Sequence, residues 1–323
     1  MTQRFVVVGL GNFGSWWVCG LCKQNNPLEI ICYDPDPKAL QVLQDRIIRI
    51  PNRFTHNKKI KFIGQIFHLP EVVDLVVIAT NSDVRLPVYR DLSGRCSSRL
   101  WVLEKALAQS INDLGEISDI SEGKKVFVNH SRPLQPASQI LKSILNQFDK
   151  PKAVTLNGGK YELASNSAHF IHLAEYLLDV RLSSVDVRNL ASQWHPSSTR
   201  SGFYDVKGVL NVTLDDDISF FLDWQETRKK AANWEFEFEG VLVKYCEITG
   251  TISINNEVVA TAPLIDFSDL VPLVMCNLFS GTNPLDGLPT IDRVLPIHLE
   301  LTSNLVAHRR AISGLDSDVV PFS

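Results

Sequence analysis

Near its start the chain reads Phe5-Val6-Val7-Val8-Gly9-Leu10-Gly11-Asn12-Phe13-Gly14, and this stretch decides the fold. An apolar, β-branched run of strand length meets glycines spaced G-x-G-x-x-G, and a helical pattern follows. In such a turn Gly9 permits the tight bend, Gly11 lets the backbone approach a pyrophosphate, and Gly14 lets the helix lie close to the strand. The stretch therefore predicts a dinucleotide-binding turn, with Asn12 and Phe13 presenting the helix N-terminus to the phosphates.

The next strand-like run, at 28–33, ends in Asp34. An acidic residue about 20 positions beyond the glycines accepts hydrogen bonds from the adenosine ribose hydroxyls. The alternative is that Asp34 only caps the turn Asp34-Pro35-Asp36-Pro37. Because a carboxylate repels a 2′-phosphate and no arginine follows directly, the sequence favours NAD over NADP as cofactor.

The length of 323 residues suits two domains, because single cores stop growing at roughly 250–300 residues. A net charge of -4 indicates no nucleic-acid surface, and neither a secretory signal nor a membrane span is evident. The six cysteines lie mostly in apolar patterns, so we expect Cys19-Gly20-Leu21-Cys22 to be core rather than a redox motif. A cytoplasmic protein without nucleic-acid, membrane or metal partners is predicted.

Strand-like and helix-like patterns alternate up to Asn129. Apolar runs predict strands at 5–8, 29–33, 61–63, 74–79, 99–103 and 125–129. Such continuous runs are typical of parallel strands covered on both faces, and helical patterns such as 38–48 lie between them. The polar, basic segment 51–59 is expected to be a loop. An α/β fold with a Rossmann-type, doubly wound parallel sheet follows.

Beyond Asn129 the pattern changes. Helical patterns cover 135–148, a segment ending at 179, 268–279 and 290–311, and a strand is expected at 152–156. Further β-rich runs lie at 184–188, 208–214, 219–225, 234–238, 242–248 and 251–254. Because no long crossover helices separate these runs, we expect an α+β domain with an open, mostly antiparallel sheet.

Ligands of parallel sheets bind beyond the carboxyl ends of the strands, so the residues that leave each strand are candidate site residues. These exits read Thr80-Asn81-Ser82, Glu104-Lys105 and Asn129-His130-Ser131-Arg132. A charged pair directly after Trp101-Val102-Leu103 is not expected in a core. Its alternative interpretation is a surface salt bridge, which contributes little to stability.

Over essentially the whole chain these features resemble the Gfo/Idh/MocA oxidoreductases, the family of glucose–fructose oxidoreductase and inositol dehydrogenase. The resemblance includes the glycine turn, Val77-Ile78-Ala79-Thr80-Asn81-Ser82, Glu104-Lys105-Ala106-Leu107-Ala108, Val128-Asn129-His130-Ser131-Arg132 and the His169 helix. It implies a Rossmann domain at 1–130 and an α+β substrate-binding and oligomerisation domain at 131–288. It also implies a C-terminal helix at 289–323 that packs on the first domain, and a homodimer or homotetramer.

Glu104-Lys105 resembles the family's Glu-Lys-Pro motif, whose lysine lies beside the nicotinamide and the reacting oxygen. His169 resembles the histidine of the motif Asp-x-Gly-x-His-x-x-Asp, but Ser165 and His172 stand where its aspartates belong. A branch with Asn-x-x-His is closer, and Asn166 is then the polar partner. Such branches resemble enzymes of surface-polysaccharide, nucleotide-sugar or nonulosonic-acid pathways.

The resemblance implies hydride transfer between nicotinamide and a secondary alcohol or ketone of a sugar, nucleotide sugar or sugar acid. Lys105 would stabilise charge on the reacting oxygen, His169 would act as acid or base, and Asn166 would orient the substrate. Further cofactor contacts are expected from Asp34, Thr80, Asn81, Ser82 and Glu104, and substrate contacts from Arg132, Tyr161 and His172.

Each of these residues also has a structural interpretation. A histidine on the face of a helix is often a hydrogen-bonded core residue, which applies to His169 and His172. Asn166 could cap its helix, and Arg132 and Tyr161 could be structural. The alternative function is that of a non-catalytic, dinucleotide-binding regulatory or scaffolding protein.

Overall fold

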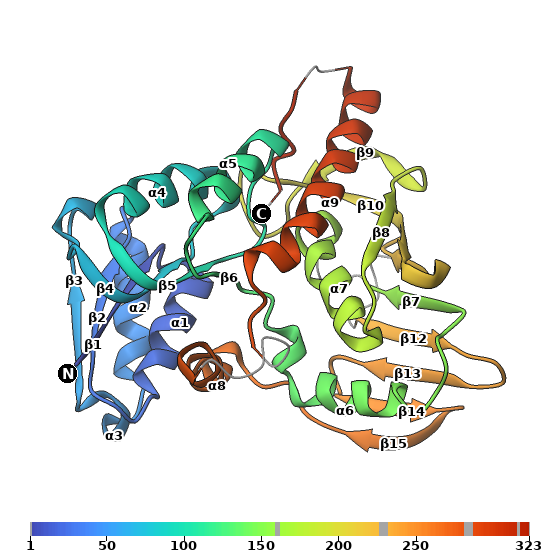
Figure 1. Cartoon of the computed structure of the whole chain (residues 1–323), viewed down its shortest axis with the longest axis horizontal. Coiled ribbons are helices and arrows are strands. Elements are labelled where there is room, and N and C mark those ends of the chain that lie inside the picture. Colours follow the sequence, from blue (N-terminus) through green and yellow to red (C-terminus); the bar gives the residue numbers. More distant parts are fainter. Residues whose placement is uncertain (1, 159–161, 226–231, 281–286, 315–316, 323) are drawn as a thin grey trace. The chain divides into compact units, whose positions relative to one another are not determined.

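The computed structural model describes residues 2–158, 162–225, 232–280, 287–314 and 317–322 (Figure 1). The chain forms two compact units. The first contains Met1–Ala108, Gly115–Ser131 and Asp266–Arg293, and the second contains Gln109–Leu114, Arg132–Ile265 and Val294–Ser323. The predicted domain bounds at 130 and 288 differ from this division, which places Asp266–Arg293 in the first unit and Val294–Ser323 in the second. The packing of 289–323 on the first domain stays a prediction.

A six-stranded parallel sheet in the order β3-β2-β1-β4-β5-β6 forms the centre of the first unit. Its strands are β1 (Gln3–Val8), β2 (Leu28–Tyr33), β3 (Lys58–Phe62), β4 (Val72–Ile78), β5 (Ser97–Leu103) and β6 (Val126–Val128). The side chains of Phe5, Val6, Val7 and Val8 are buried on both faces of the sheet, as expected for a central parallel strand. The predicted Rossmann-type sheet is therefore confirmed.

The helices of the first unit include a segment from late in the chain. They are α1 (Asn12–Cys22), α2 (Pro37–Ile48), α3 (Asn52–Thr55), η1 (Ile66–His68), α4 (Ser82–Arg95), α5 (Ile111–Ser121), which begins in the second unit, and α8 (Phe267–Ser280). α8 packs on α1 at Gly20, where an added Cβ would lie 2.4 Å from the Cβ of Val271. Cys19 and Cys22 are buried free thiols, and burial raises the pKa of Cys22 to about 12, which confirms their core role.

The expectation that 51–59 is a loop is wrong in part, because α3 lies there and β3 begins at Lys58. In the described sheet β3 pairs with β2 alone, so it is an edge strand and its side chains can be polar. Lys61 Nζ lies 2.5 Å from the carboxylate of Glu29 on β2, so a basic side chain of β3 is used in an ion pair at the sheet edge.

A nine-stranded sheet forms the second unit, in the order β15-β14-β13-β12-β7-β11-β10-β8, with β9 paired to β10. Its strands are β7 (Ala153–Asn157), β8 (Leu182–Asp186), β9 (Leu190–Pro196), β10 (Tyr204–Leu214), β11 (Ser219–Asp223), β12 (Asn233–Glu237), β13 (Leu242–Cys246), β14 (Thr251–Ile254) and β15 (Glu257–Thr261). Among the described strands of this sheet, only β7 and β11 pair in parallel, so the predicted mostly antiparallel sheet is confirmed.

The second unit also contains α6 (Pro136–Leu145), α7 (Leu163–Leu178), most of α9 (Ile291–Ser313) and the short η2 (Arg132–Leu134) and η3 (Asp215–Asp217). α7 packs against α6 and β10, and most of its side chains are buried. Within the described ranges, no helix combines the length and apolar character needed to cross a bilayer.

Candidate active site

The glycine turn leaves β1 at its carboxyl end and leads into α1. Gly9 has φ +83, and a Cβ there would lie 2.7 Å from the backbone nitrogen of Thr80. A Cβ on Gly14 would lie 1.7 Å from the carbonyl oxygen of Gly9, whereas one on Gly11 would meet nothing within 4 Å. The first and third glycines thus allow the bend and the close packing, and Gly11 faces open space. No side chain caps α1, so its first N–H groups are available to an anion.

Asp34 links the end of β2 to this turn. Its carboxylate accepts hydrogen bonds from the N–H of Leu10 at 2.6 Å and from the N–H of Asp36 at 2.9 Å. Asp34 therefore caps the turn. Each oxygen keeps a further lone pair, so binding of a ribose hydroxyl remains compatible with these contacts and stays a prediction.

Asn12 and Phe13 follow the glycines with different surroundings. Asn12 is exposed, and its side-chain oxygen accepts a hydrogen bond from Arg46 at 3.0 Å. The ring of Phe13 packs edge-on against Trp16, at 5.1 Å between centroids, and against Phe267, at 6.0 Å. The Phe13 side chain is thus used in packing, and its backbone N–H is the group that could contact a phosphate.

The exits of β4 and β5 are held together by a buried arginine that sequence reasoning missed. Arg85 on α4 donates hydrogen bonds to the carbonyl oxygens of Thr80 and Ala106, and to that of Leu107 at 3.3 Å. The hydroxyl oxygen of Thr80 is buried without a hydrogen-bond partner among the described residues. Asn81 is exposed at the start of α4 and Ser82 is buried. Arg85 therefore fixes the two loops that carry Thr80 and Lys105.

Glu104 and Lys105 are both buried, with exposed fractions of 3% and 8%, so the surface salt bridge interpretation is wrong. Burial raises the pKa of Glu104. Its oxygen Oε1 accepts hydrogen bonds from Trp17 Nε1 at 3.1 Å and from Asn129 Nδ2 at 2.5 Å. Glu104 thus anchors the end of β5 to α1 and to the end of β6, and Lys105 follows directly on this anchored strand.

Asn129 was recognised only as a strand exit, and the structure gives it a defined orientation. Its Nδ2 group is bound to Glu104, and its Oδ1 atom is buried without a hydrogen-bond partner in the described part of the chain. A buried oxygen left without a donor is costly unless a ligand or water supplies one. Asn129 Oδ1, after β6, and Thr80 Oγ1, after β4, are therefore available acceptors at the carboxyl ends of the two strands that flank β5.

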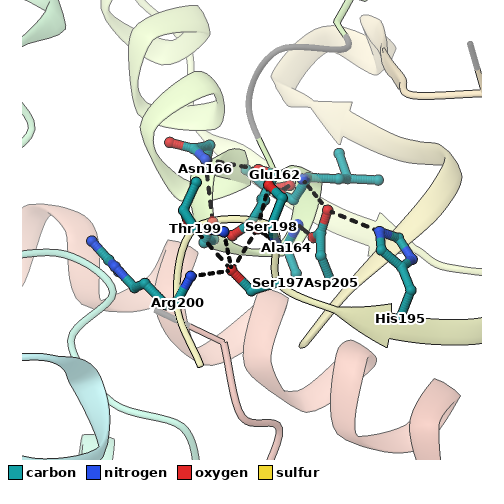
Figure 2. A network of polar contacts seen from close by, with 12 residues as sticks. Glu162, Ala164, Asn166, His195, Ser197, Ser198, Thr199, Arg200 and Asp205 are labelled. Atoms are coloured by element: carbon teal, nitrogen blue, oxygen red, sulfur yellow. Dashed lines mark hydrogen bonds and ion pairs between the residues drawn. The ribbon is translucent and has the colours of Figure 1, made fainter. Parts of the chain in front are cut away.

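In the second unit, the start of α7 is held by carboxylates, as Figure 2 shows. The buried carboxylate of Asp205 accepts hydrogen bonds from the N–H groups of Leu163 at 3.0 Å and Ala164 at 2.7 Å. Burial raises the pKa of Asp205 to about 6, and His195 Nε2 lies 4.0 Å away. Glu162 accepts a hydrogen bond from Ser197 at 2.6 Å, which ties the β9–β10 loop to the same helix end.

Because Asp205 caps α7, the interpretation of Asn166 as the helix cap is wrong. Asn166 lies inside the first turn, where its Nδ2 group donates to the carbonyl oxygen of Glu162 at 2.8 Å and to Ser165 at 3.2 Å. Its side chain is half-buried. The amide is thus oriented by its own helix.

His169 and His172 both lie on the buried side of α7, with exposed fractions of 8% and 6%. Burial lowers the pKa of His172 to about 3, and the nearby His298 and Arg181 add to this effect, so His172 is neutral at physiological pH. The substrate contact expected of His172 stays a prediction.

Arg132 donates a hydrogen bond to the buried carboxylate of Glu247 at 2.6 Å, and its guanidinium lies 4.4 Å from the ring centroid of Phe170. Tyr161 lies outside the described residues. Lys105, in the first unit, and His169, in the second, are thus each positioned within their own unit, and their catalytic roles stay predictions.

Glu175, near the C-terminal end of α7, is a buried carboxyl group whose pKa shift makes stability depend on pH. Burial raises the pKa of Glu175 to about 7, although Leu182 N–H donates to it at 2.8 Å. Because the folded state holds this proton more tightly, its contribution to stability is complete below the ordinary pKa of 4.5 and is lost as pH rises through about 7.

We therefore expect Glu175→Gln to match the wild type at about pH 5 and to be more stable by roughly 2–3 kcal/mol at about pH 8. Urea unfolding followed by circular dichroism at both pH values measures this difference. The exposed Glu239→Gln is the control and should change stability equally little at both. A Glu175→Gln variant with the pH dependence of the wild type would contradict the prediction.

No protein-family model matches the chain, and no curated protein matches it in sequence. Its fold is shared by solved structures. The super-repressor mutant of Gal80p from Saccharomyces cerevisiae has 13% identity and a TM-score of 0.70, with 96% of each chain covered. The myo-inositol dehydrogenase from Lactobacillus casei, in complex with NAD(H) and myo-inositol, has 14% identity and a TM-score of 0.64, with 94% of this chain and 93% of that chain covered.

UDP-N-acetylglucosamine 3-dehydrogenase GnnA from Acidithiobacillus ferrooxidans has 13% identity and a TM-score of 0.65, with 97% of this chain and 99% of that chain covered. These neighbours are Gfo/Idh/MocA-type proteins, so the resemblance is confirmed at the level of the fold. Identities this low show a shared fold and carry no activity over to this chain.

Proposed function

We propose that the chain is an oxidoreductase that uses a nicotinamide dinucleotide, with NAD preferred to NADP. It would transfer a hydride between nicotinamide and a secondary alcohol or ketone carbon of a sugar, nucleotide sugar or sugar acid. The proposal rests on one observation: at the carboxyl ends of the first sheet, open space at Gly11 and the unpartnered oxygens of Thr80 and Asn129 accompany the buried Lys105. The inositol dehydrogenase of the same fold, which holds NAD(H), supports it.

The residues present fit a dinucleotide. Gly11 leaves room for a pyrophosphate beside the uncapped start of α1, and Asp34 stands where a ribose hydroxyl would be bound. Thr80 and Asn129 supply acceptors for polar hydrogens of the nicotinamide half. When bound, the nicotinamide ring accepts or donates the hydride.

The chain itself would supply charge stabilisation and proton transfer. The Lys105 ammonium would stabilise negative charge that develops on the reacting oxygen, an effect that is strong in a buried site. His169 would take the hydroxyl proton during oxidation and return it during reduction. Asn166, oriented by its hydrogen bond to the Glu162 carbonyl, would hold a substrate hydroxyl.

A second candidate function is that of a dinucleotide-binding regulatory protein without hydride transfer. It is favoured by the internal use of two expected substrate residues, since Arg132 is bound to Glu247 and His172 is buried and neutral. Gal80p structures share the fold, and the one from Kluyveromyces lactis is described as a transcriptional regulator.

One experiment separates the two candidates. NADH fluorescence is first titrated with protein, and a pre-formed complex with NAD or NADH is then followed over time with a panel of sugars, nucleotide sugars and sugar acids. The oxidoreductase predicts binding and turnover with at least one member of the panel. Binding without turnover across the panel would favour the regulatory function, and absence of dinucleotide binding would reject both.

The cofactor preference depends on the charge of Asp34. We expect Asp34→Ser to shift the ratio of the NADPH and NADH dissociation constants by about 10- to 100-fold toward NADPH, because the repulsion of a 2′-phosphate is removed. Fluorescence titration with both cofactors measures the ratio, which cancels any general weakening from the lost Leu10 contact.

The control is Asp36→Ser, because Asp36 caps α2 through the N–H of Lys38 and should leave the ratio unchanged. An unchanged ratio in Asp34→Ser would mean that this carboxylate only caps the turn.

A further inference from the structure

A guanidinium from a distant helix lies against the glycine turn. Arg46 is on α2, and its Nη1 group donates hydrogen bonds to the carbonyl oxygen of Asn12 at 3.3 Å and to the hydroxyl of Ser15. Its Nη2 group donates to Asn12 Oδ1 at 3.0 Å, and its carbon Cζ lies 5.9 Å from the ring centroid of Trp16. These contacts hold the charge beside the first turn of α1.

The protein uses only part of the hydrogen-bonding capacity of the Arg46 guanidinium in the described contacts. A guanidinium has five N–H donors, and the described contacts use both donors of Nη1 and one of Nη2. Nη1 and Nη2 both donate to Asn12 from one edge of the planar group. The second Nη2 donor and Nε–H lie on another edge. Two parallel donors of this kind match two oxygens of a phosphate.

The charge of Arg46 is also uncompensated within the described ranges, where no carboxylate forms an ion pair with it. The first turn of α1 contains no acidic residue. The Ser15 hydroxyl is also bonded to the carbonyl oxygens of Gly11 and Asn12, so the groups that the described residues place against Arg46 are neutral.

We propose that Arg46 binds a phosphate group of the dinucleotide through its Nε and Nη2 edge. The inference rests on the proposed function, and it adds a charged contact from α2 that the sequence alone did not indicate. A phosphate at this place is either the pyrophosphate, which NADH and ADP-ribose also contain, or the 2′-phosphate of NADPH.

The test measures dissociation constants of NADH, NADPH and ADP-ribose for the full-length wild type, Arg46→Gln and Arg46→Lys. Calorimetry or fluorescence is used at two salt concentrations. Arg49→Gln is the matched control, because Arg49 is exposed and directly follows α2. We expect Arg46→Gln to weaken binding by about 10- to 100-fold and to reduce its salt dependence. Arg46→Lys should recover part of the loss, because the charge is kept without the paired donors.

Equal weakening of all three ligands supports contact with the pyrophosphate, and weakening of NADPH alone supports contact with the 2′-phosphate. Binding like that of Arg49→Gln, or an unchanged salt dependence, overturns the inference and leaves Arg46 as a link between helices. Thermal unfolding of each variant identifies loss of fold. If the wild type binds none of the ligands, the proposed function fails first.

Discussion

Replacing Lys105 by methionine is expected to lower turnover roughly 10²- to 10⁴-fold while NADH affinity changes by no more than about threefold. The ammonium would act on charge that exists only in the transition state, whereas the dinucleotide is held mainly by the glycine turn. Methionine keeps the apolar stem of this buried side chain, which is 8% exposed, so the fold should be retained. Steady-state kinetics with a substrate from the panel and a fluorescence titration measure the two effects.

The matched control is Lys125→Met. Lys125 is exposed and directly precedes β6, so it lies at the opposite ends of the strands from Lys105. Its replacement should change neither turnover nor NADH affinity. If Lys105→Met turned over at the wild-type rate, Lys105 would have no part in the mechanism. If it lost NADH affinity instead, Lys105 would be a cofactor-binding residue only.

The first sheet could be predicted because its signals are local. Strands buried on both faces appear as continuous apolar runs, as in 5–8 and 75–79, and Gly9 and Gly14 stand where a side chain would clash. The two strands missed in the second sheet, β9 and β15, lack such a signal. Both are largely exposed, and Val258 and Val259 on β15 break the alternation expected of a half-buried strand.

The contacts that orient the candidate site residues were not predictable in the same way. Arg85 reaches Ala106 across 21 residues, and Asp205 caps α7 at Ala164 across 41 residues. Hydrogen bonds between such distant positions leave no periodic pattern in the sequence. Asn129 was the exception, since it leaves β6 at the carboxyl end, where ligands of parallel sheets bind.

Resemblance to a family identified positions but not their surroundings. His172, which the resemblance places at the substrate, is buried and neutral, and Arg132 is paired with Glu247, so their substrate contacts stay predictions. The packing of a particular core decides whether a polar side chain is free to bind a ligand. The predicted homo-oligomer also stays a prediction, because the exposed surface of one chain does not identify a partner.

Replacing Arg132 by methionine is expected to lower the free energy of unfolding by about 3–5 kcal/mol. Glu247 is 2% exposed and accepts hydrogen bonds from Arg132 at 2.6 Å and from Trp234 Nε1 at 3.2 Å. Without the guanidinium, this buried carboxylate would lose its cationic partner. Urea unfolding followed by circular dichroism measures the loss, and NADH affinity should not change, because the dinucleotide is proposed to bind in the first unit.

A second substitution, at Glu247, distinguishes the effect of leaving its charge unpaired from the effect of losing the packing of the Arg132 side chain. In the double variant with Glu247→Gln, the neutral amide still accepts from Trp234 and no charge is left unpaired, so much of the stability should return. Arg188→Met breaks the surface ion pair that the exposed Arg188 forms with Asp186 and should have little effect on stability. If Arg132→Met were as stable as the wild type but raised KM for a substrate, Arg132 would be a substrate-binding residue. Buried ion pairs are costly to break from one side, so this stability difference tests the role of Arg132 before any substrate is known.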